Sequence, residues 1–213
     1  MEGFYRMNIK DPGYDIGYKN SDCFWGTHPA ELVKNVATLF ADISKINILD
    51  LGCGEGKNSY YLATKGFNVT GIDASIIAIE KARKLWDKIE NLSFYIGDIR
   101  DYDIKINYDV ILATGSLHCL MNENEITKVI SKMKTHTLPN GYNLISAFNN
   151  GKQDLNGHPT FFKPCLLSHD YYLYRYKDWK IELASNIGQE DCHPDNNIVH
   201  FHSITRLLAK NES

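Results

Sequence analysis

Apolar residues gather in short continuous runs, separated by segments in which they recur every three or four positions. Such runs are typical of buried parallel strands, and such spacing is typical of amphipathic helices. The runs predict strands at residues 46–51, 67–72, 92–96, 108–113 and 142–148. The segments between them predict helices at residues 57–65, 75–86 and 122–135. This alternation predicts a doubly wound α/β fold with a mostly parallel sheet and right-handed crossovers.

The two ends of the chain follow other patterns. Residues 1–28 are rich in Gly, Tyr, Asp and Asn and have no steady period, which predicts an irregular arm or lid. Pro29 is suited to the first turn of a helix that carries apolar residues as far as Phe40. Pro139-Asn140-Gly141 predicts a turn ahead of the fifth strand.

The last third of the chain predicts an antiparallel end to the sheet. A helix at 166–174 precedes strands at 179–186 and 198–209, with the turn-rich stretch 188–197 between the two strands. Two strands joined without a helix are most simply antiparallel. We therefore predict a seven-stranded, mostly parallel sheet with an antiparallel end strand. The expected organisation is an N-terminal arm, 1–28, followed by a single domain, 29–213.

Composition and charge exclude several classes of protein. The chain has 213 residues, enough for one large domain, and a net charge of −3 with scattered basic residues, so we expect no nucleic-acid partner. It has neither a run of about 18 apolar residues nor an apolar leader, so we expect no membrane segment and no signal peptide. The odd set of cysteines, without a Cys-x-x-Cys pair, predicts reduced thiols in the cytoplasm. They are Cys23, Cys53, Cys119, Cys165 and Cys192.

The strongest local signal is the stretch Asp50-Leu-Gly52-Cys-Gly54-Glu-Gly56, which follows the first strand and opens the first helix. Glycines let the backbone approach a ligand closely, and free amides at a helix start favour anionic groups. The third glycine comes one residue too early for the dinucleotide pattern Gly-x-Gly-x-x-Gly, which weakens a nicotinamide-nucleotide interpretation.

Acidic residues follow the next two strands. Asp73 ends the second strand, where a carboxylate suits the two hydroxyls of an adenosine ribose. Asp98 follows the third strand and could accept a hydrogen bond from the exocyclic amine of a base. Each aspartate alone is equally well explained as a turn residue or helix cap, and the glycines as a chain reversal. Three such features at successive strand ends favour a nucleoside-bearing ligand.

The segment ILDLGCGEGKNSYYLATKGFNVTGIDAS resembles the cofactor-binding half of the class I S-adenosylmethionine-dependent methyltransferases. The resemblance implies a Rossmann-like methyltransferase fold and S-adenosyl-L-methionine as cofactor. The residues that we expect to bind this cofactor are Trp25, Asp50, Gly52, Cys53, Gly54, Asp73, Ala74, Asp98, Ile99 and Thr114.

A closer resemblance covers most of the chain. The FWG around residue 25, PNGYNLI at 139–145, FFKPCLLSHDYYLYRYKDWKIE and the final LLAK resemble the tellurite-resistance type of small methyltransferases. That family tends to carry a histidine-arginine pair in the stretch 188–197. This chain has Asp191-Cys192-His193-Pro194 and no arginine there, which leaves the acceptor open.

Histidines are the candidate catalytic residues. His118 lies after the fourth strand, facing the expected position of the methyl group, and is either a base, a substrate contact or a side chain packed under the cofactor. His200 and His202 share one face of a strand and form a cluster with His193, which could bind a metal, an oxyanion or the substrate, or could simply occupy a half-buried face. Their spacing fits no standard zinc pattern, so we predict no metal ligand. If one of the four is a base, the rate should rise between about pH 6 and 7.

The arm offers Tyr18, Phe24 and Trp25, either to cover the cofactor or to anchor the arm to the core. The leading functional hypothesis is methyl transfer to a small molecule, such as a chalcogen or thiol compound. The alternatives are a non-catalytic S-adenosylmethionine-binding module and a nicotinamide-nucleotide-binding protein, since a fold does not fix a function. The sequence does not indicate an oligomeric state.

Overall fold

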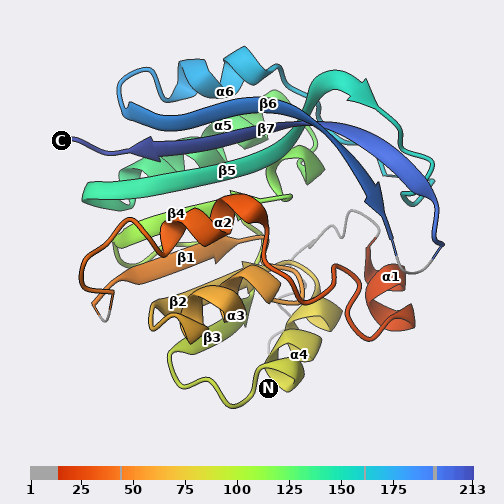
Figure 1. The fold of residues 1–213 in the computed structure, drawn as a ribbon, viewed down its shortest axis with the longest axis horizontal. Coiled ribbons are helices and arrows are strands. Elements are labelled where there is room, and N and C mark those ends of the chain that lie inside the picture. The colour runs from red at the N-terminus through yellow and green to blue at the C-terminus, as the bar shows by residue number, and fades with distance from the viewer. Residues whose placement is uncertain (1–13, 44, 161, 194–195) are drawn as a thin grey trace, which may run out of the picture.

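The computed structural model describes residues 14–43, 45–160, 162–193 and 196–213. A seven-stranded sheet with the order β3-β2-β1-β4-β5-β7-β6 forms its centre (Figure 1). The strands are β1 Asn47–Leu51, β2 Asn68–Asp73, β3 Leu92–Ile96, β4 Tyr108–Thr114, β5 Thr137–Gln153, β6 Lys180–Cys192 and β7 Val199–Lys210. β7 pairs antiparallel with both β5 and β6, and the other pairings are parallel. The predicted mixed sheet is therefore confirmed, with its antiparallel strand lying between β5 and the edge strand β6.

Helices cover both faces of the sheet. They are α1 Asp15–Asn20, α2 Glu31–Val36, α3 Lys57–Thr64, α4 Ile76–Leu85, α5 Glu123–Thr135 and α6 His169–Arg175, with a short 3₁₀ turn, η1, at Leu117–Cys119. Successive strand residues point to opposite faces, so Ile48 packs on the side of α2 and α3 while Leu49 packs on the side of α5 and α6. Both residues are fully buried, which makes each face a core of its own.

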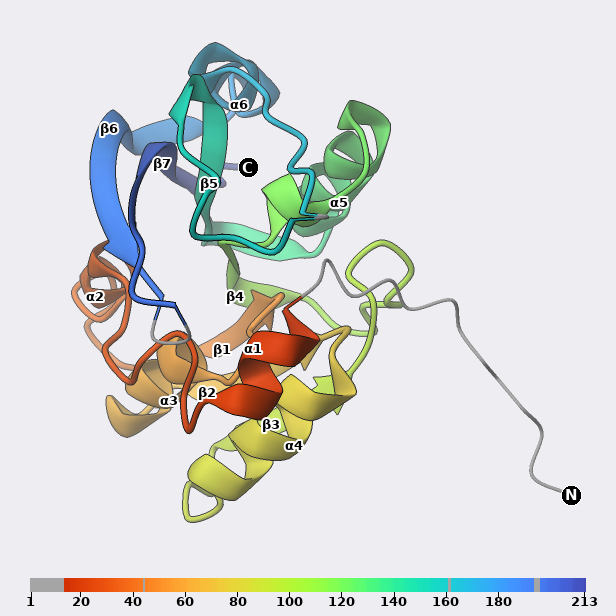
Figure 2. The ribbon, with the colours of Figure 1, turned by 90° about the vertical axis from the view of Figure 1, so that its right-hand side faces the viewer.

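The arm is more regular than its sequence predicts. Residues 14–28 contain the helix α1, which lies beside α4 (Figure 2). Tyr14, Tyr18 and Phe24 are buried in one cluster together with Ala78 and Phe162. The prediction of an irregular arm is therefore wrong for this part, and residues 1–13 lie outside the described residues. A six-residue helix is too short to show a helical period in the sequence. Its stability comes from packing against α4.

Two strands extend beyond their predicted ends. Pro139-Asn140-Gly141 is an irregularity within β5 rather than a turn before it. Asn140 takes a φ of 63°, and its amide donates to the Asn211 carbonyl, so the pairing continues past it. β6 runs on to Cys192 and takes in much of the stretch expected to be a loop. Within the described part of the chain, no helix combines the length and apolar character that crossing a membrane requires.

Candidate active site

A cavity of about 790 Å³ opens where the carboxyl ends of β1, β2 and β4 meet the arm and the β5–β7 end of the sheet. This is the position at which ligands bind in open α/β sheets, and the volume suits a small-molecule ligand. Nine of the ten residues expected to bind cofactor line it: Trp25, Gly52, Cys53, Gly54, Asp73, Ala74, Asp98, Ile99 and Thr114.

The glycine loop sits tightly against its neighbours. Gly52 has a φ of +75°, and a Cβ there would lie 2.3 Å from the Cβ of Ser116, so no side chain fits. The Asp73 carboxylate fixes the loop, because Oδ2 accepts from the Gly54 amide at 2.8 Å and Oδ1 accepts from the Ser75 amide at 2.8 Å. The loop and the acidic end of β2 therefore form one rigid wall of the cavity.

Asp50, the tenth expected cofactor residue, lies beneath this wall and does not line the cavity. Its side chain is fully buried, and Oδ2 accepts a 2.7 Å hydrogen bond from the Ser59 hydroxyl. Burial raises the pKa of Asp50 to about 6, with the Ser59 hydrogen bond opposing the shift and the charge of Asp73 adding to it. Asp50 therefore contacts Ser59 of α3 and not the space that a ligand would occupy.

Replacing Asp50 with asparagine is expected to stabilise the protein at neutral pH. Because the folded-state pKa of about 6 exceeds the ordinary 3.8, the folded protein keeps a proton in this window that the unfolded chain releases. The free energy of unfolding then falls as pH rises from about 4 to 6, by about 3 kcal/mol. The asparagine variant lacks this pH-dependent loss. The difference in unfolding free energy between the variant and the wild type should therefore grow from about pH 4 to 6 and stay constant above that. Denaturant unfolding at several pH values measures this; an advantage independent of pH contradicts it.

Asp98 is paired with Arg100 at the edge of the cavity. The Arg100 Nε donates to both carboxylate oxygens, at 2.9 and 3.0 Å, and its Nη2 donates to Oδ2. Burial alone would raise the pKa of Asp98, but the hydrogen bonds and charge of Arg100 hold it below its ordinary value. Asp98 is therefore an ionised acceptor at neutral pH, held in a fixed orientation.

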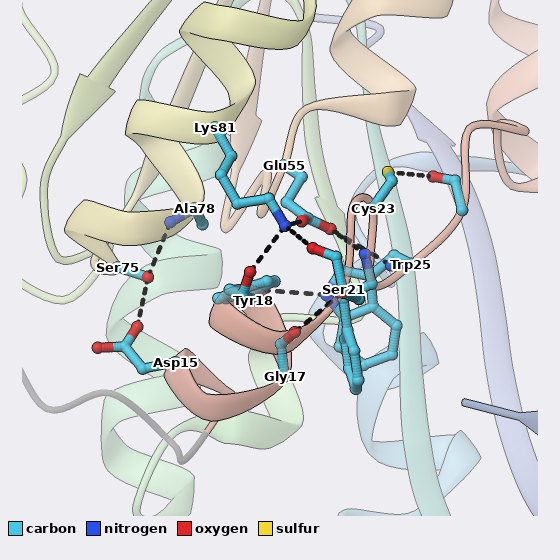
Figure 3. Close-up of polar contacts among 12 residues, drawn as sticks. Asp15, Gly17, Tyr18, Ser21, Cys23, Trp25, Glu55, Ser75, Ala78 and Lys81 are labelled. Atoms are coloured by element: carbon cyan, nitrogen blue, oxygen red, sulfur yellow. Dashed lines mark hydrogen bonds and ion pairs between the residues drawn. The ribbon is translucent and has the colours of Figure 1, made fainter. Parts of the chain in front are cut away.

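Glu55, which the sequence analysis did not single out, attaches the arm to the glycine loop (Figure 3). Its Oε2 accepts from the Phe24 amide at 2.7 Å and the Trp25 amide at 3.3 Å, and Oε1 lies 2.5 Å from the Lys81 ammonium. Lys81 in turn donates to the carbonyls of Tyr18 and Ser21. The Glu55 carboxylate thus binds two backbone amides of the arm directly. It also binds Lys81, which donates to two backbone carbonyls of the arm.

Further contacts hold the arm over the cavity. The Trp25 indole donates to the Tyr18 hydroxyl at 3.0 Å, and Lys57 donates to the Trp25 carbonyl at 2.8 Å. Ser75, the N-cap of α4, donates to Asp15. The anchoring interpretation of the arm aromatics is confirmed for Phe24, which is buried, and Tyr18 and Trp25 line the cavity that the cofactor is expected to occupy.

His118 lines the cavity from η1. Its Nδ1 accepts from the Phe148 amide at 3.1 Å, so the neutral ring carries its proton on Nε2. Burial lowers the pKa of His118 to about 3, with a smaller contribution from His202. The ring therefore stays neutral near pH 7, and the rise in rate between about pH 6 and 7 is not expected from His118 as a base.

The remaining expected histidines, His193, His200 and His202, do not line the cavity. They pack together behind it, and His158, which sequence reasoning missed, lies among them. Phe148 separates this group from His118, since its ring stacks on His118 at 4.0 Å and on His202 at 3.9 Å. His158 lies between β5 and α6, where no motif or period marks it.

Hydrogen bonds fix the proton positions in part of this cluster. The Gln153 amide nitrogen donates to two carbonyls, so its Oε1 accepts from His202 Nδ1 at 2.8 Å. His202 Nε2 therefore accepts from His158 Nε2 at 2.9 Å. His158 Nδ1 is then left to accept from the Tyr14 hydroxyl at 3.0 Å. Tyr14 of the arm, His158, His202 and Gln153 of β5 are therefore linked in series by hydrogen bonds.

The opposite half of the cavity contains cationic and polar groups that the sequence analysis did not single out. They include Lys163, Arg206, Gln189 and Ser146. Arg206, on β7, donates to Gln189 on β6 at 2.8 Å. The stretch 188–197 has no arginine, and Arg206 of the neighbouring strand lines the cavity beside it. No pattern in the sequence links these residues. The pairing of β7 with β6 and with β5 brings Arg206 beside Gln189 and Ser146.

Comparison with known proteins agrees with this arrangement. A family model described as "Tellurite resistance protein TehB" matches residues 24–202. The curated protein "Probable S-adenosyl-L-methionine-dependent methyltransferase TehB" of Haemophilus influenzae is 35% identical over 177 residues, covering 79% of this chain and 58% of that protein. A ubiquinone biosynthesis O-methyltransferase of Rickettsia canadensis is 32% identical over 126 residues, covering 57% of this chain and 51% of that protein.

The fold agrees with a solved member of the same family. The crystal structure of TehB from Haemophilus influenzae matches with a TM-score of 0.70 and 28% identity, covering 84% of this chain and 61% of that one. The chain thus spans a little under two thirds of the length of these TehB relatives. These matches confirm the resemblance and the methyltransferase fold predicted from the glycine loop. The chain therefore belongs to the TehB family of S-adenosyl-L-methionine-dependent methyltransferases.

Proposed function

We propose that this protein transfers a methyl group from S-adenosyl-L-methionine to a small anionic acceptor. The observation that carries the proposal is one continuous cavity, with the glycine loop and two aspartates on one side and Lys163 and Arg206 on the other. The TehB relative of Haemophilus influenzae supports the cofactor assignment. In this proposal the cofactor binds beside the glycine loop, and the acceptor binds next to it, beside Lys163 and Arg206.

The residues present fit the cofactor. Asp73 offers carboxylate oxygens at the end of β2, where ribose hydroxyls bind in such sheets. Asp98 is an ionised acceptor at the end of β3, and the Gly52–Gly54 backbone allows close approach. When bound, S-adenosyl-L-methionine supplies a methyl group already activated on a sulfonium. The protein's task is then to align the acceptor and exclude water, which the arm serves by covering the cavity.

The side chains in the half of the cavity opposite the glycine loop favour an anionic acceptor over one whose nucleophilic group must first lose a proton. His118 has its Nδ1 lone pair engaged by the Phe148 amide and carries its proton on Nε2, so it acts as a donor. Lys163 and Arg206 add positive charge to the same cavity, partly offset by Glu31 and Asp191, which also line it. A thiolate or another chalcogen anion is nucleophilic without a base, and these groups would attract and orient it. We therefore propose a chalcogen or thiol compound as acceptor.

An acceptor panel tests this function. The purified protein is incubated with S-adenosyl-L-methionine labelled in its methyl group and with thiols, inorganic selenide, amines and phenols in parallel. We expect labelled product from the thiol or selenide arms and little from the amines and phenols. Labelling confined to amines or phenols overturns the acceptor class, and cofactor binding without labelling in any arm overturns the transferase assignment.

Replacing Asp73 with alanine is expected to weaken the binding of S-adenosyl-L-methionine by about 10-fold or more. The change removes the acceptor proposed for the ribose and frees the Gly54 amide from its 2.8 Å hydrogen bond. Calorimetric titration measures the affinity. Asp87→Ala, an exposed aspartate near the end of α4, is the matched control and should bind like the wild type. Equal affinities in the two variants would remove Asp73 from the cofactor site.

A further inference from the structure

Three buried imidazoles from separate segments converge behind the cavity. His158, His193 and His200 each offer a ring nitrogen, and these nitrogens all lie within 4.8 Å of one another. His158 follows β5, His193 follows β6 and His200 lies on β7, so the set forms only when the fold brings these segments together. The sequence spacing predicted no metal ligand here, because it did not include His158.

The spacing of the ring centres is compatible with imidazoles around a metal ion, and the ligand nitrogens, which lie within 4.8 Å of one another, would move closer together on binding. Imidazoles bound tetrahedrally at about 2.0–2.1 Å from zinc have ring centres about 5 Å apart. The observed separations between ring centres are 4.8 Å for His158–His193, 5.0 Å for His158–His200 and 4.7 Å for His193–His200. His202 lies 4.9 Å from His158 and 4.8 Å from His200, within reach as a fourth ligand.

His200 is oriented as metal-binding histidines usually are. Its Nδ1 donates to the Ile198 carbonyl at 2.7 Å, which fixes the tautomer and leaves the lone pair on Nε2. That Nε2 is buried and has no hydrogen-bond partner in the described structure. A buried polar atom without a partner is costly, and a bound metal would satisfy it. His202 has the same tautomer, with Nδ1 donating to Gln153, but its Nε2 accepts from His158.

The surroundings suit a closed structural site. Phe24 stacks on His193 at 5.2 Å, Trp25 meets it edge-on at 5.1 Å, and Phe162 stacks on His158 at 5.0 Å. None of the three histidines lines the active-site cavity, so the substrate does not reach them there. Such a site would connect the arm, the segment after β5 and the β6–β7 end.

From this geometry we propose that His158, His193 and His200 bind a divalent first-row transition metal, with zinc best suited to an all-imidazole set. The metal bond would replace one of the two hydrogen bonds of His158, to the Tyr14 hydroxyl or to His202. The His158 ring would stay neutral, since its remaining proton can sit on the nitrogen that does not bind the metal. The site is independent of the methyl-transfer proposal.

Metal titration of the untagged, chelator-treated protein tests the site. We expect one equivalent of Co²⁺ to bind, to give the intense visible absorption of a tetrahedral ion, to be displaced by Zn²⁺, and to raise the melting temperature. His158→Gln and His200→Gln should each weaken binding by about 100-fold or more, beyond the loss typical of an outer-shell change. His28→Gln, an exposed histidine in the arm, should bind as the wild type does.

Circular dichroism and cofactor titration without metal show whether the two variants remain folded. Absence of stoichiometric binding by the wild type overturns the proposal, as does undiminished binding in both folded variants. Loss of binding in Cys192→Ser together with a thiolate absorption band overturns the all-imidazole ligand set, because Cys192 is exposed next to His193.

Discussion

Replacing Glu55 with alanine is expected to weaken the binding of S-adenosyl-L-methionine by about 10- to 100-fold and to cost about 3 kcal/mol of unfolding free energy. The carboxylate is 2% exposed and binds the Phe24 and Trp25 amides as well as the Lys81 ammonium. Removing one partner of a buried ion pair costs about 3–5 kcal/mol. The Lys81 side chain is 21% exposed and keeps two carbonyl partners, which places the loss at the lower end of that range. The arm then loses its attachment to the glycine loop. Calorimetry and denaturant unfolding measure the two effects.

Two companion variants separate the role of Glu55 from a general effect of charge. Glu55→Gln keeps an acceptor for the arm amides and loses the ion pair, so both its losses should be intermediate. Glu80→Gln removes an exposed carboxylate from α4 and should behave as the wild type does. A Glu55→Ala protein that is destabilised but binds the cofactor with unchanged affinity would show that the arm is not part of the cofactor site.

Replacing Gly52 with alanine is expected to cost about 3 kcal/mol of unfolding free energy and most of the cofactor affinity. A positive φ costs a non-glycine residue about 1–2 kcal/mol, and overpacking adds about 1–3 kcal/mol. The new Cβ would lie 2.3 Å from the Ser116 Cβ, and Ser116 holds the Leu51 carbonyl at 2.7 Å. The collision therefore displaces both the loop and the end of β1. Denaturant unfolding and calorimetric titration measure these losses.

Gly115→Ala is the matched stability control. Gly115 has a φ of +78°, close to the +75° of Gly52, but no atom within 4 Å of a Cβ built on it. It should lose only the conformational part, about 1–2 kcal/mol. Similar losses in the two variants would show that φ alone requires glycine at position 52, and that the contact with Ser116 relaxes freely.

The sheet could be predicted from the sequence because its signal is local. The runs around Ile48 and Val110 are mostly apolar, as strands buried on both faces require, and the glycine cluster marks where the first of them ends. The acidic residues that end β2 and follow β3 could be found for the same reason. They follow the strands directly, so the strand assignments place them at one edge of the sheet.

The remaining features depend on contacts between distant segments. Helix α1 is stabilised by packing against α4, and Pro139-Asn140-Gly141 stays within β5 because the chain near Asn211 pairs with it. His158 carries no motif and becomes part of a cluster only when β7 lies beside it. Glu55 lies between two glycines, and no pattern in the sequence shows that the arm returns to it. Sequence periodicity predicts which face of a helix or strand is buried. It does not predict which distant segments pack against that face.

Strand β7 contributes to two groups of residues with one face, and this limits which changes in the sequence leave both intact. His200, His202, Ile204 and Arg206 alternate with residues of the other face, so the first two belong to the histidine cluster and the last two to the cavity wall. Pairing with β6 continues without a register shift through this stretch. A substitution in this stretch of β7 affects only the histidine cluster or only the cavity wall, depending on which side chain it replaces. A one-residue insertion or deletion would instead turn every side chain over, because strand periodicity is two. Length in this segment is therefore under stronger constraint than residue identity.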